Sequence, residues 1–290
     1  MPLEMHEVLI RPATPADAAI CGQISFDAFT SINARHGFPC DFPSVEVATA
    51  VQSMLFSHPS FYCIVAEVGG RIIGSNCLDE RSTVFGVGPI TIDPTVQNSG
   101  VGRRLMEAVM ERASVRGAAG VRLVQATWHT RSLALYASLG FEVRELLCCM
   151  QGQSLQHDMP ECTVRSASAL DVDACSALAV RVHGFDRRRE LEDGVVQRTA
   201  VVVERGGKIT GYASSLAFFG HATATTNLDM MAMIASAEGF GGPGILVPAR
   251  DSVLFEWCLA DGLRIVQPMT LMSTGLYQEP KGAWLPSVSF

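Results

Sequence analysis

A glycine-rich turn between a predicted strand and a predicted helix is the segment best suited to chemistry. Residues 97–102, Gln-Asn-Ser-Gly-Val-Gly, follow a strand that ends at Pro94. Glycine has no Cβ, so backbone amides can crowd together there. Free amides at the positive end of a helix bind pyrophosphate, and Arg103 and Arg104 add positive charge. The pattern predicts a phosphate-binding loop; a plain turn that starts a helix is the alternative.

A second motif follows at residues 132–141, Ser-Leu-Ala-Leu-Tyr-Ala-Ser-Leu-Gly-Phe. Together with Ile-Asp-Pro at residues 92–94 and the Gln-x-x-Gly-x-Gly form of the turn, it resembles the acetyl-CoA motifs of the GNAT N-acetyltransferases. The resemblance extends over residues 7–150, with a weaker echo over residues 162–290. It implies an enzyme that transfers acetyl from acetyl-CoA, without a metal, to a primary amine of a small molecule in a ternary complex.

The resemblance also implies roles for individual residues. Backbone amides of the turn would hold the CoA pyrophosphate, and backbone groups of Ile90 and Ile92 would bind the pantetheine arm and polarise the acetyl carbonyl. A bulge in that strand would make room for the arm. The cofactor contacts expected on this basis are Ile90, Thr91, Ile92, Gln97, Asn98, Ser99, Gly100, Val101, Gly102, Arg103, His129, Ser132 and Tyr136.

Tyr136 is expected near the thioester sulfur, where its phenol would protonate the leaving thiolate. An aromatic residue that packs on the core is the alternative. His129 stands seven positions earlier, where family members often have asparagine. An imidazole can still donate one hydrogen bond, so an altered cofactor contact is expected, with a catalytic base as the second interpretation.

The sequence does not identify the base securely. Asp79 and Glu80 end the predicted third strand, near where this family often places carboxylates that face the acceptor. Exposed acids at the end of a hairpin are the alternative, and positioning with a water chain could supply much of the rate. The loop at residues 29–44 is expected to line the acceptor site or to be simple core; its notable side chains are His36, Phe38, Pro39 and Phe42.

The chain repeats itself. Arg11, Asp17 and Cys21 recur at the same spacing as Arg165, Asp171 and Cys175. Residues 35–38, 64–74 and 121–125 recur in the same order as 182–185, 201–211 and 263–267. The repeat predicts a tandem duplication. The expected fold is α/β (α+β, mixed sheet), with two tandem GNAT-like domains, each a central mixed β-sheet flanked by helices.

Apolar spacing and turn residues predict the elements of the first half. Gly69 and Gly70 join two β-rich runs as a hairpin, and apolar residues recur at helical spacing after Gly100. The predicted strands are 64–68, 71–78, 84–92 and 122–127, and the predicted helices are 101–116 and 131–139.

The second half lacks the phosphate-binding pattern. Aligned on the repeat, residues 245–251 stand opposite the turn, but Pro248 has no amide to donate and Asp251 would cap the helix itself and repel phosphate. Tyr277 stands opposite Tyr136 as a relic or a packing residue. We expect an acetyl-CoA-binding catalytic domain at residues 1–152, a degenerate domain without the phosphate loop at residues 160–290, and one CoA per chain.

Composition limits the class of protein. A 290-residue chain with 48% hydrophobic and 18% charged residues is typical of a globular protein. The net charge of −7 without a long Lys/Arg cluster disfavours nucleic acid as a partner, and no apolar run is long enough to span a membrane. Without a signal-peptide pattern or a Cys-x-x-Cys pair, the nine cysteines are expected to be reduced thiols in a cytoplasmic monomer or homodimer.

Two other functions are compatible with these features. The first is an enzyme that transfers a longer acyl group, or one that modifies a protein lysine or N-terminus. The second is a non-catalytic sensor of acyl-CoA or another ligand.

Overall fold

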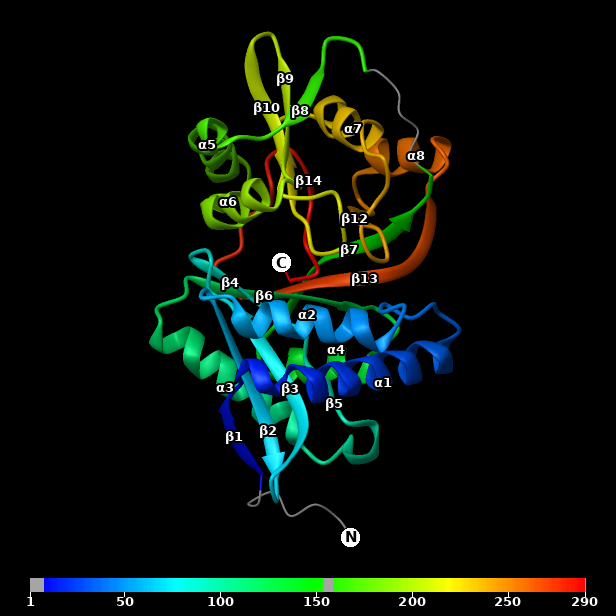
Figure 1. Cartoon of the computed structure of the whole chain (residues 1–290). Helices are drawn as coiled ribbons and strands as arrows, with labels where there is room; N and C mark the ends of the chain where they lie inside the picture. Colours follow the sequence, from blue (N-terminus) through cyan, green and yellow to red (C-terminus); the bar gives the residue numbers. More distant parts are fainter. Residues whose placement is uncertain (1–7, 154–158, 290) are drawn as a thin grey trace.

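The computed structural model describes residues 8–153 and 159–289 (Figure 1), so the expected boundary between the halves lies partly outside the described ranges. The first half contains β1 (Leu9–Pro12), α1 (Ala18–His36), α2 (Val45–Ser57), β2 (Phe61–Val68), β3 (Arg71–Asp79), β4 (Val84–Val87), β5 (Thr91–Ile92), α3 (Val101–Val115), β6 (Gly120–Ala126), α4 (Thr130–Ser138) and β7 (Glu142–Gln151). The second half contains β8 (Thr163–Ser166), α5 (Val172–His183), α6 (Arg188–Gln197), β9 (Val201–Arg205), β10 (Lys208–Ala213), β11 (Ala222–Ala224), α7 (Asn227–Ala235), β12 (Ile245–Pro248), α8 (Ser252–Ala260), β13 (Arg264–Gly275) and β14 (Ala283–Leu285).

Helices cover both faces of the first sheet. Val65 packs against α1, with Cys21 as a neighbour, whereas Ile64 faces α3 and its residue Leu105. Successive side chains of a strand point to opposite faces, so one strand serves both layers. Within the described ranges, no helix has the length and apolar character needed to cross a membrane.

The predicted hairpin and the predicted helices are present. Gly69 and Gly70 have φ of 56° and 82°, the left-handed conformation that a two-residue hairpin turn requires. The helix predicted at residues 101–116 is α3, and the one predicted at 131–139 is α4.

The start of the repeat is the same structure in both halves. An aspartate follows the first strand in each half and forms a capping box with Thr14 or Ser168. In each half an arginine of the first strand bridges two carboxylates: Arg11 pairs with Asp17 and Glu67, and Arg165 pairs with Asp171 and Glu204. These matching contacts support the predicted tandem arrangement.

The halves exchange strands, which the repeat did not predict. The large sheet has the order β1-β2-β3-β4-β6-β13-β7-β12, with β5 beside β3. Strand β13 therefore lies between β6 and β7 of the first half, and β7 lies between β13 and β12 of the second half (Figure 1). The first half thus does not complete its sheet without the second.

The two sheets also differ in strand direction. The large sheet is mixed because β4 and β6 run parallel while its other pairs are antiparallel. The second sheet has the order β14-β11-β10-β9-β8, and all its described pairs are antiparallel. The expectation of a mixed sheet in each half is correct for the first half only.

The expected counterpart of the phosphate loop is in the wrong place. By element order, α7 corresponds to α3, β12 to β6, α8 to α4 and β13 to β7. Residues 245–248 are therefore strand β12, Asp251 caps α8, and the true counterpart of the turn is residues 225–226, just before α7. Tyr277 follows β13 rather than lying on α8, and the guanidinium groups of Arg122 and Arg144 stack on its ring.

One pair of cysteines also corrects an expectation. Cys63 and Cys77 lie directly opposite each other across β2 and β3 and form a disulfide. The other seven cysteines are free, as expected.

Candidate active site

A cleft opens where two parallel strands of the large sheet part. Strand β4 pairs with β6 only from Val84 to Gly86. The chain then passes the cis peptide Gly88–Pro89, and β5 continues beside β3 alone. The strand expected at residues 84–92 is therefore two short strands, and the gap between β5 and the end of β6 is a cleft of about 420 Å³.

The backbone of Ile90 and Ile92 is directed to this cleft. Asp93 donates its amide to the carbonyl of Ile73 in β3 at 2.9 Å. Backbone groups of successive residues in a strand point in opposite directions, so those of Ile92 point away from β3. The carbonyl of Ile92 accepts a hydrogen bond from Nε2 of Gln97 at 3.3 Å, so the predicted contact with the pantetheine arm requires the amide of Ile92.

The predicted phosphate loop starts α3 with little side-chain cover. Gly100 is the N-cap residue, with φ of 86° and no side-chain cap, and Asn98 also has a positive φ of 66°. Within the described ranges, no hydrogen-bond acceptor is recorded for the amides of Gly100, Val101 and Gly102. A Cβ at Gly102 would lie 3.8 Å from Leu135 and 3.9 Å from Ile92, which are ordinary van der Waals contacts. This geometry suits a diphosphate.

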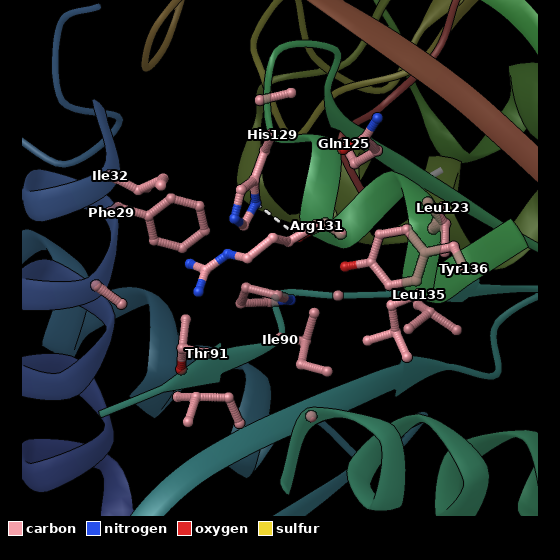
Figure 2. A pocket seen from close by; sticks show the side chains of 18 of the residues that line it. Phe29, Ile32, Ile90, Thr91, Leu123, Gln125, His129, Arg131, Leu135 and Tyr136 are labelled. Atoms are coloured by element: carbon pink, nitrogen blue, oxygen red, sulfur yellow. Dashed lines mark hydrogen bonds between the residues drawn. The ribbon is translucent and has the colours of Figure 1, made fainter. Parts of the chain in front are cut away.

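Charge around the loop is positive. The first turn of α3 contains no acidic residue, and its third residue is Arg103. Arg131, at the start of α4, donates to Gln97 at 3.0 Å and to Asn98 at 2.7 Å, and Figure 2 shows its side chain extending across the cleft. Arg131 was not among the predicted site residues.

Tyr136 and His129 line the opposite wall, on or just before α4 (Figure 2). Burial raises the pKa of Tyr136 to about 12, so its phenol keeps its proton near neutral pH. Ser132 interacts with that phenol, and its hydroxyl lies 2.6 Å from Nδ1 of His129. Tyr136, Ser132 and His129 therefore form one polar row along the helix.

His129 is a neutral side chain at physiological pH. Burial, with a smaller effect of Arg131, lowers its pKa to about 4. Its Nε2 is buried and has no hydrogen-bond partner among the described residues. When Ser132 donates to Nδ1, Nε2 carries the hydrogen and can donate to a ligand. This fits the expected cofactor contact better than the alternative of a base.

Comparison with known proteins identifies this arrangement. Residues 29–141, which contain the loop, the parted strands and Tyr136, match the model of the acetyltransferase (GNAT) family. The chain therefore contains a GNAT acetyltransferase domain over residues 29–141. It is an acyltransferase, and acetyl-CoA is its co-substrate. No protein with a curated description matches the sequence.

Solved structures extend the fold likeness beyond the matched domain. A candidate acetyltransferase of Pyrococcus horikoshii has a TM-score of 0.75 at 17% identity, over 97% of this chain and 95% of that one. A GCN5-related N-acetyltransferase of Sphaerobacter thermophilus has a TM-score of 0.63 at 14% identity, and the match covers 98% of both chains. A tandem GNAT protein from the clavulanic acid biosynthesis pathway has a TM-score of 0.56 at 13% identity, and the match covers 93% of this chain and 98% of that one. The two-part GNAT fold therefore accounts for nearly the whole chain.

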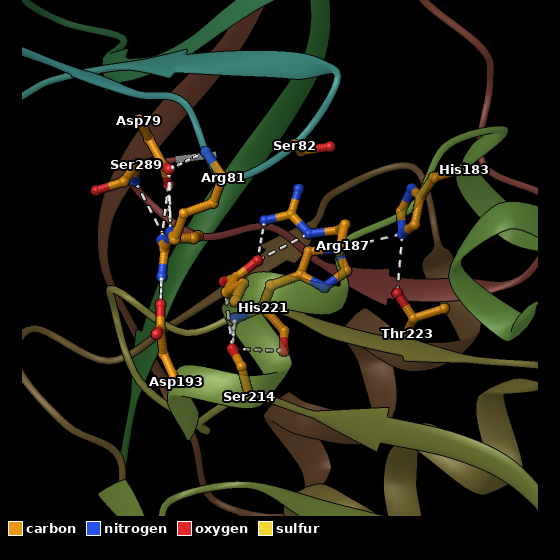
Figure 3. A network of polar contacts seen from close by, with 12 residues as sticks. Asp79, Arg81, Ser82, His183, Arg187, Asp193, Ser214, His221, Thr223 and Ser289 are labelled. Carbon is orange, nitrogen blue, oxygen red and sulfur yellow. Dashed lines mark hydrogen bonds and ion pairs between the residues drawn. The ribbon is translucent and has the colours of Figure 1, made fainter. Parts of the chain in front are cut away.

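The two predicted base candidates lie outside the cleft. Asp79 is held by Arg81, at 2.6 Å, and Arg81 also pairs with Asp193 of α6 (Figure 3). Glu80 pairs with Arg112 at 2.7 Å. Neither carboxylate is among the residues that line the cleft. Both have structural roles in this arrangement, and Asp79 helps to join the two halves.

Both halves contribute to the acceptor side of the cleft. The loop at residues 29–44 provides Phe29, Asp41 and Phe42, while the second half provides Phe218, Phe219, Met269, Val288 and Ser289. Residues of this loop therefore line the cleft, as expected from the sequence. Phe38 instead stacks on Trp128 with ring centroids 5.1 Å apart, and the tilted ring of His36 contacts Trp128 at 4.8 Å.

Asp41 is the most notable residue that sequence reasoning missed. Among the described residues that line the cleft it is the one carboxylate. A signal was present, because Asp41 lies among the aromatic residues and prolines of the predicted acceptor loop. The described residues contain no group of three His, Cys, Asp or Glu side chains that could hold a metal ion.

Proposed function

We propose that this GNAT enzyme transfers acetyl from acetyl-CoA to a primary amine of a small molecule, by direct attack of the amine in a ternary complex. The observation that carries the proposal is a single cleft lined by the open phosphate loop, the parted strands, Tyr136 and an acceptor side closed by the second half.

The residues of the first half divide the work. The free amides at Gly100–Gly102, with Arg103 and Arg131, hold the diphosphate. Acetyl-CoA supplies the acetyl group as an activated thioester. A backbone amide of the Ile90–Ile92 segment donates to the carbonyl oxygen as negative charge develops on it. Tyr136 holds a proton at its phenol and gives it to the departing sulfur.

The second half favours a small acceptor over a protein lysine or N-terminus. Phe218, which is buried, and Val288 stand on the acceptor side, and the amide of Val288 donates to the carbonyl of Phe218 at 2.8 Å. A protein chain would have to displace this packed wall to reach the thioester. A small amine needs only the cleft.

We also propose a division of roles along the chain, with acetyl-CoA held by residues 1–152 and no phosphate loop in residues 160–290. At the start of α7, Thr226 accepts from the amide of Asp229, and the Asp229 carboxylate accepts from the amide of Thr226. These amides are therefore occupied by the protein itself.

The test is thiol release from acetyl-CoA in the presence of a panel of primary amines, with lysine-containing and free N-terminal peptides in parallel. The proposal expects amine-dependent thiol release and an N-acetylated product by mass spectrometry. Turnover with the peptides alone, or with a longer acyl-CoA alone, would overturn it.

A further inference from the structure

Asp41 is held in the cleft by both halves of the molecule. Nε2 of Gln267, in β13, donates to Oδ1 of Asp41 at 2.8 Å. Asn33 of α1 also hydrogen-bonds the Asp41 side chain, while donating to the carbonyl of Pro39 at 2.7 Å. Gln267 is 1% exposed and Asn33 is 2% exposed, so both partners are fixed by packing. The carboxylate is thus placed by one contact from its own half and one contact from a residue 226 positions later in the chain.

The surroundings of this carboxylate are mainly apolar and aromatic. Phe29 and Phe42 meet edge to face with ring centroids 5.5 Å apart, and Trp128, Phe218 and Phe219 also line the cleft. A carboxylate in such surroundings is costly unless it is paired. Among the described residues that line the cleft, no cationic side chain forms an ion pair with Asp41. Arg131 instead donates to Gln97 and Asn98.

We infer that Asp41 receives the ammonium group of the acceptor and takes its proton, and that the acceptor is a primary amine on an apolar body of aromatic size, without an acidic group beside the nitrogen. This inference rests on the proposed function, which it deepens by naming the substrate class. Aromatic faces attract cations as well as apolar groups, so the walls of the cleft and Asp41 favour the same ligand.

The proposed step is balanced. One N–H bond of the ammonium breaks and its proton joins the carboxylate of Asp41, which leaves a neutral amine. The amine nitrogen attacks the thioester carbonyl, the C–N bond forms and the C–S bond breaks. The sulfur takes a proton from Tyr136, and the amide nitrogen loses its second proton to solvent. Tyr136 recovers its proton from solvent through Ser132 and His129.

Gln267 is the positioning residue for this step. Burial raises the pKa of Asp41 to about 6, and the hydrogen bonds from Gln267 and Asn33 act in the opposite direction. Asp41 is therefore a carboxylate above pH 6 and loses its charge below it. Loss of the Gln267 bond must raise the pKa further.

Cys149, His129 and Tyr136, which face Asp41 or lie across the cleft from it, do not change charge in this range. Cys149 of β7 faces it, and burial raises the pKa of that thiol to about 12. Across the cleft lie His129, with a pKa of about 4, Tyr136, with a pKa of about 12, and Arg131. Cys40 precedes Asp41 and contacts Thr30 at 3.2 Å.

The experiment measures kcat/KM from pH 5 to 9 with phenethylamine, and with phenylalanine as the same body carrying an acidic group. The wild type should prefer phenethylamine by about 10-fold or more, and its kcat/KM should fall as the pH drops below about 6. Asp41→Asn should lower kcat/KM about 100-fold at pH 8, with unchanged acetyl-CoA affinity. Glu46→Gln, an exposed carboxylate of the same region, is the matched control and should behave as wild type.

Gln267→Leu tests whether Gln267 positions Asp41, because the loss of a purely structural residue would not shift the pH dependence of kcat/KM. It should shift the acidic limb of the profile to higher pH while keeping most of the activity at pH 8. It also decides the matter if Asp41→Asn fails to fold. An Asp41→Asn enzyme with wild-type kcat/KM, or a Gln267→Leu enzyme with an unmoved limb, would overturn the inference while amine acetylation itself stands. A wild type that acetylates no amine would instead overturn the proposed function.

Discussion

The starts of helices α3 and α7 occupy the same place in the two halves and have opposite chemistry. At α3, the N-cap is Gly100 with no side-chain cap, and the third helical residue is Arg103. At α7, the N-cap is Thr226 in a capping box, and the third helical residue is Asp229, which is fully buried and paired with Arg205 at 2.9 Å. One helix start leaves its amides for a ligand, and the other satisfies them internally.

This difference shows how a duplicated fold can divide its work. Free amides at a helix start cost stability unless something binds them. In the proposed division of roles, the first half accepts that cost at a ligand site, whereas the second half has a side-chain cap at the corresponding helix start. The second half also supplies β13 to the shared sheet and Gln267 to the acceptor side. We therefore propose that the second half completes the shared sheet and helps to select the acceptor.

The largest expected effect comes from giving the first helix start the charge of the second. Gly102→Asp should weaken acetyl-CoA binding by about 100-fold or more, close to 2.7 kcal/mol, because a carboxylate would face the diphosphate. Gly102→Ala is the control, since its Cβ meets only ordinary contacts. Calorimetry measures both. Wild-type affinity in the aspartate variant, with an unchanged melting temperature, would refute the assignment of the loop.

Removal of the Tyr136 hydroxyl tests whether the first half protonates the leaving thiolate. Tyr136→Phe should lower kcat about 100-fold, the lower range for a lost general acid, and leave acetyl-CoA affinity nearly unchanged. Steady-state kinetics with the best amine gives both values. Full turnover in this variant would make Tyr136 a packing residue.

A smaller effect is expected at Arg131, which adds charge to the loop but is exposed. Arg131→Gln should weaken acetyl-CoA binding about 3- to 5-fold, within the range of exposed ion pairs, and the loss should shrink at high salt. Arg189→Gln, an exposed arginine of α6, controls for net charge. Equal affinities of the two variants would remove Arg131 from the site.

The smallest effect is expected at the second helix start. Thr226→Ala removes the cap of α7 and should cost about 1 kcal/mol of unfolding free energy, with no change in acetyl-CoA binding. Ser44→Ala at α2 should cost less, because both residues accept a capping bond of 3.4 Å but Thr226 also donates its hydroxyl to the buried Asp229 carboxylate at 2.6 Å. A Thr226→Ala variant with altered acetyl-CoA affinity would contradict the separation of roles.

Local sequence patterns predicted the loop, Tyr136, the Gly69-Gly70 hairpin and the helices that follow them, because turns and helix starts depend on neighbouring residues. The strand exchange was not predictable in this way, since β13 pairs with strands more than a hundred residues earlier. The same limit produced the wrong counterpart of the loop: residues 263–267 resemble 121–125, yet β13 corresponds to β7. Asp41 was missed because Gln267, its partner, is equally remote.

The measurement that tests the central claim most directly is the stoichiometry of acetyl-CoA binding to the pure full-length protein. One open helix start and one capped helix start predict an equivalence point near one per chain, and Gly102→Asp should weaken that binding by about 100-fold or more. An equivalence point near two, with Gly102→Asp removing only half of the binding, would show that the second half also holds a CoA and would contradict the account.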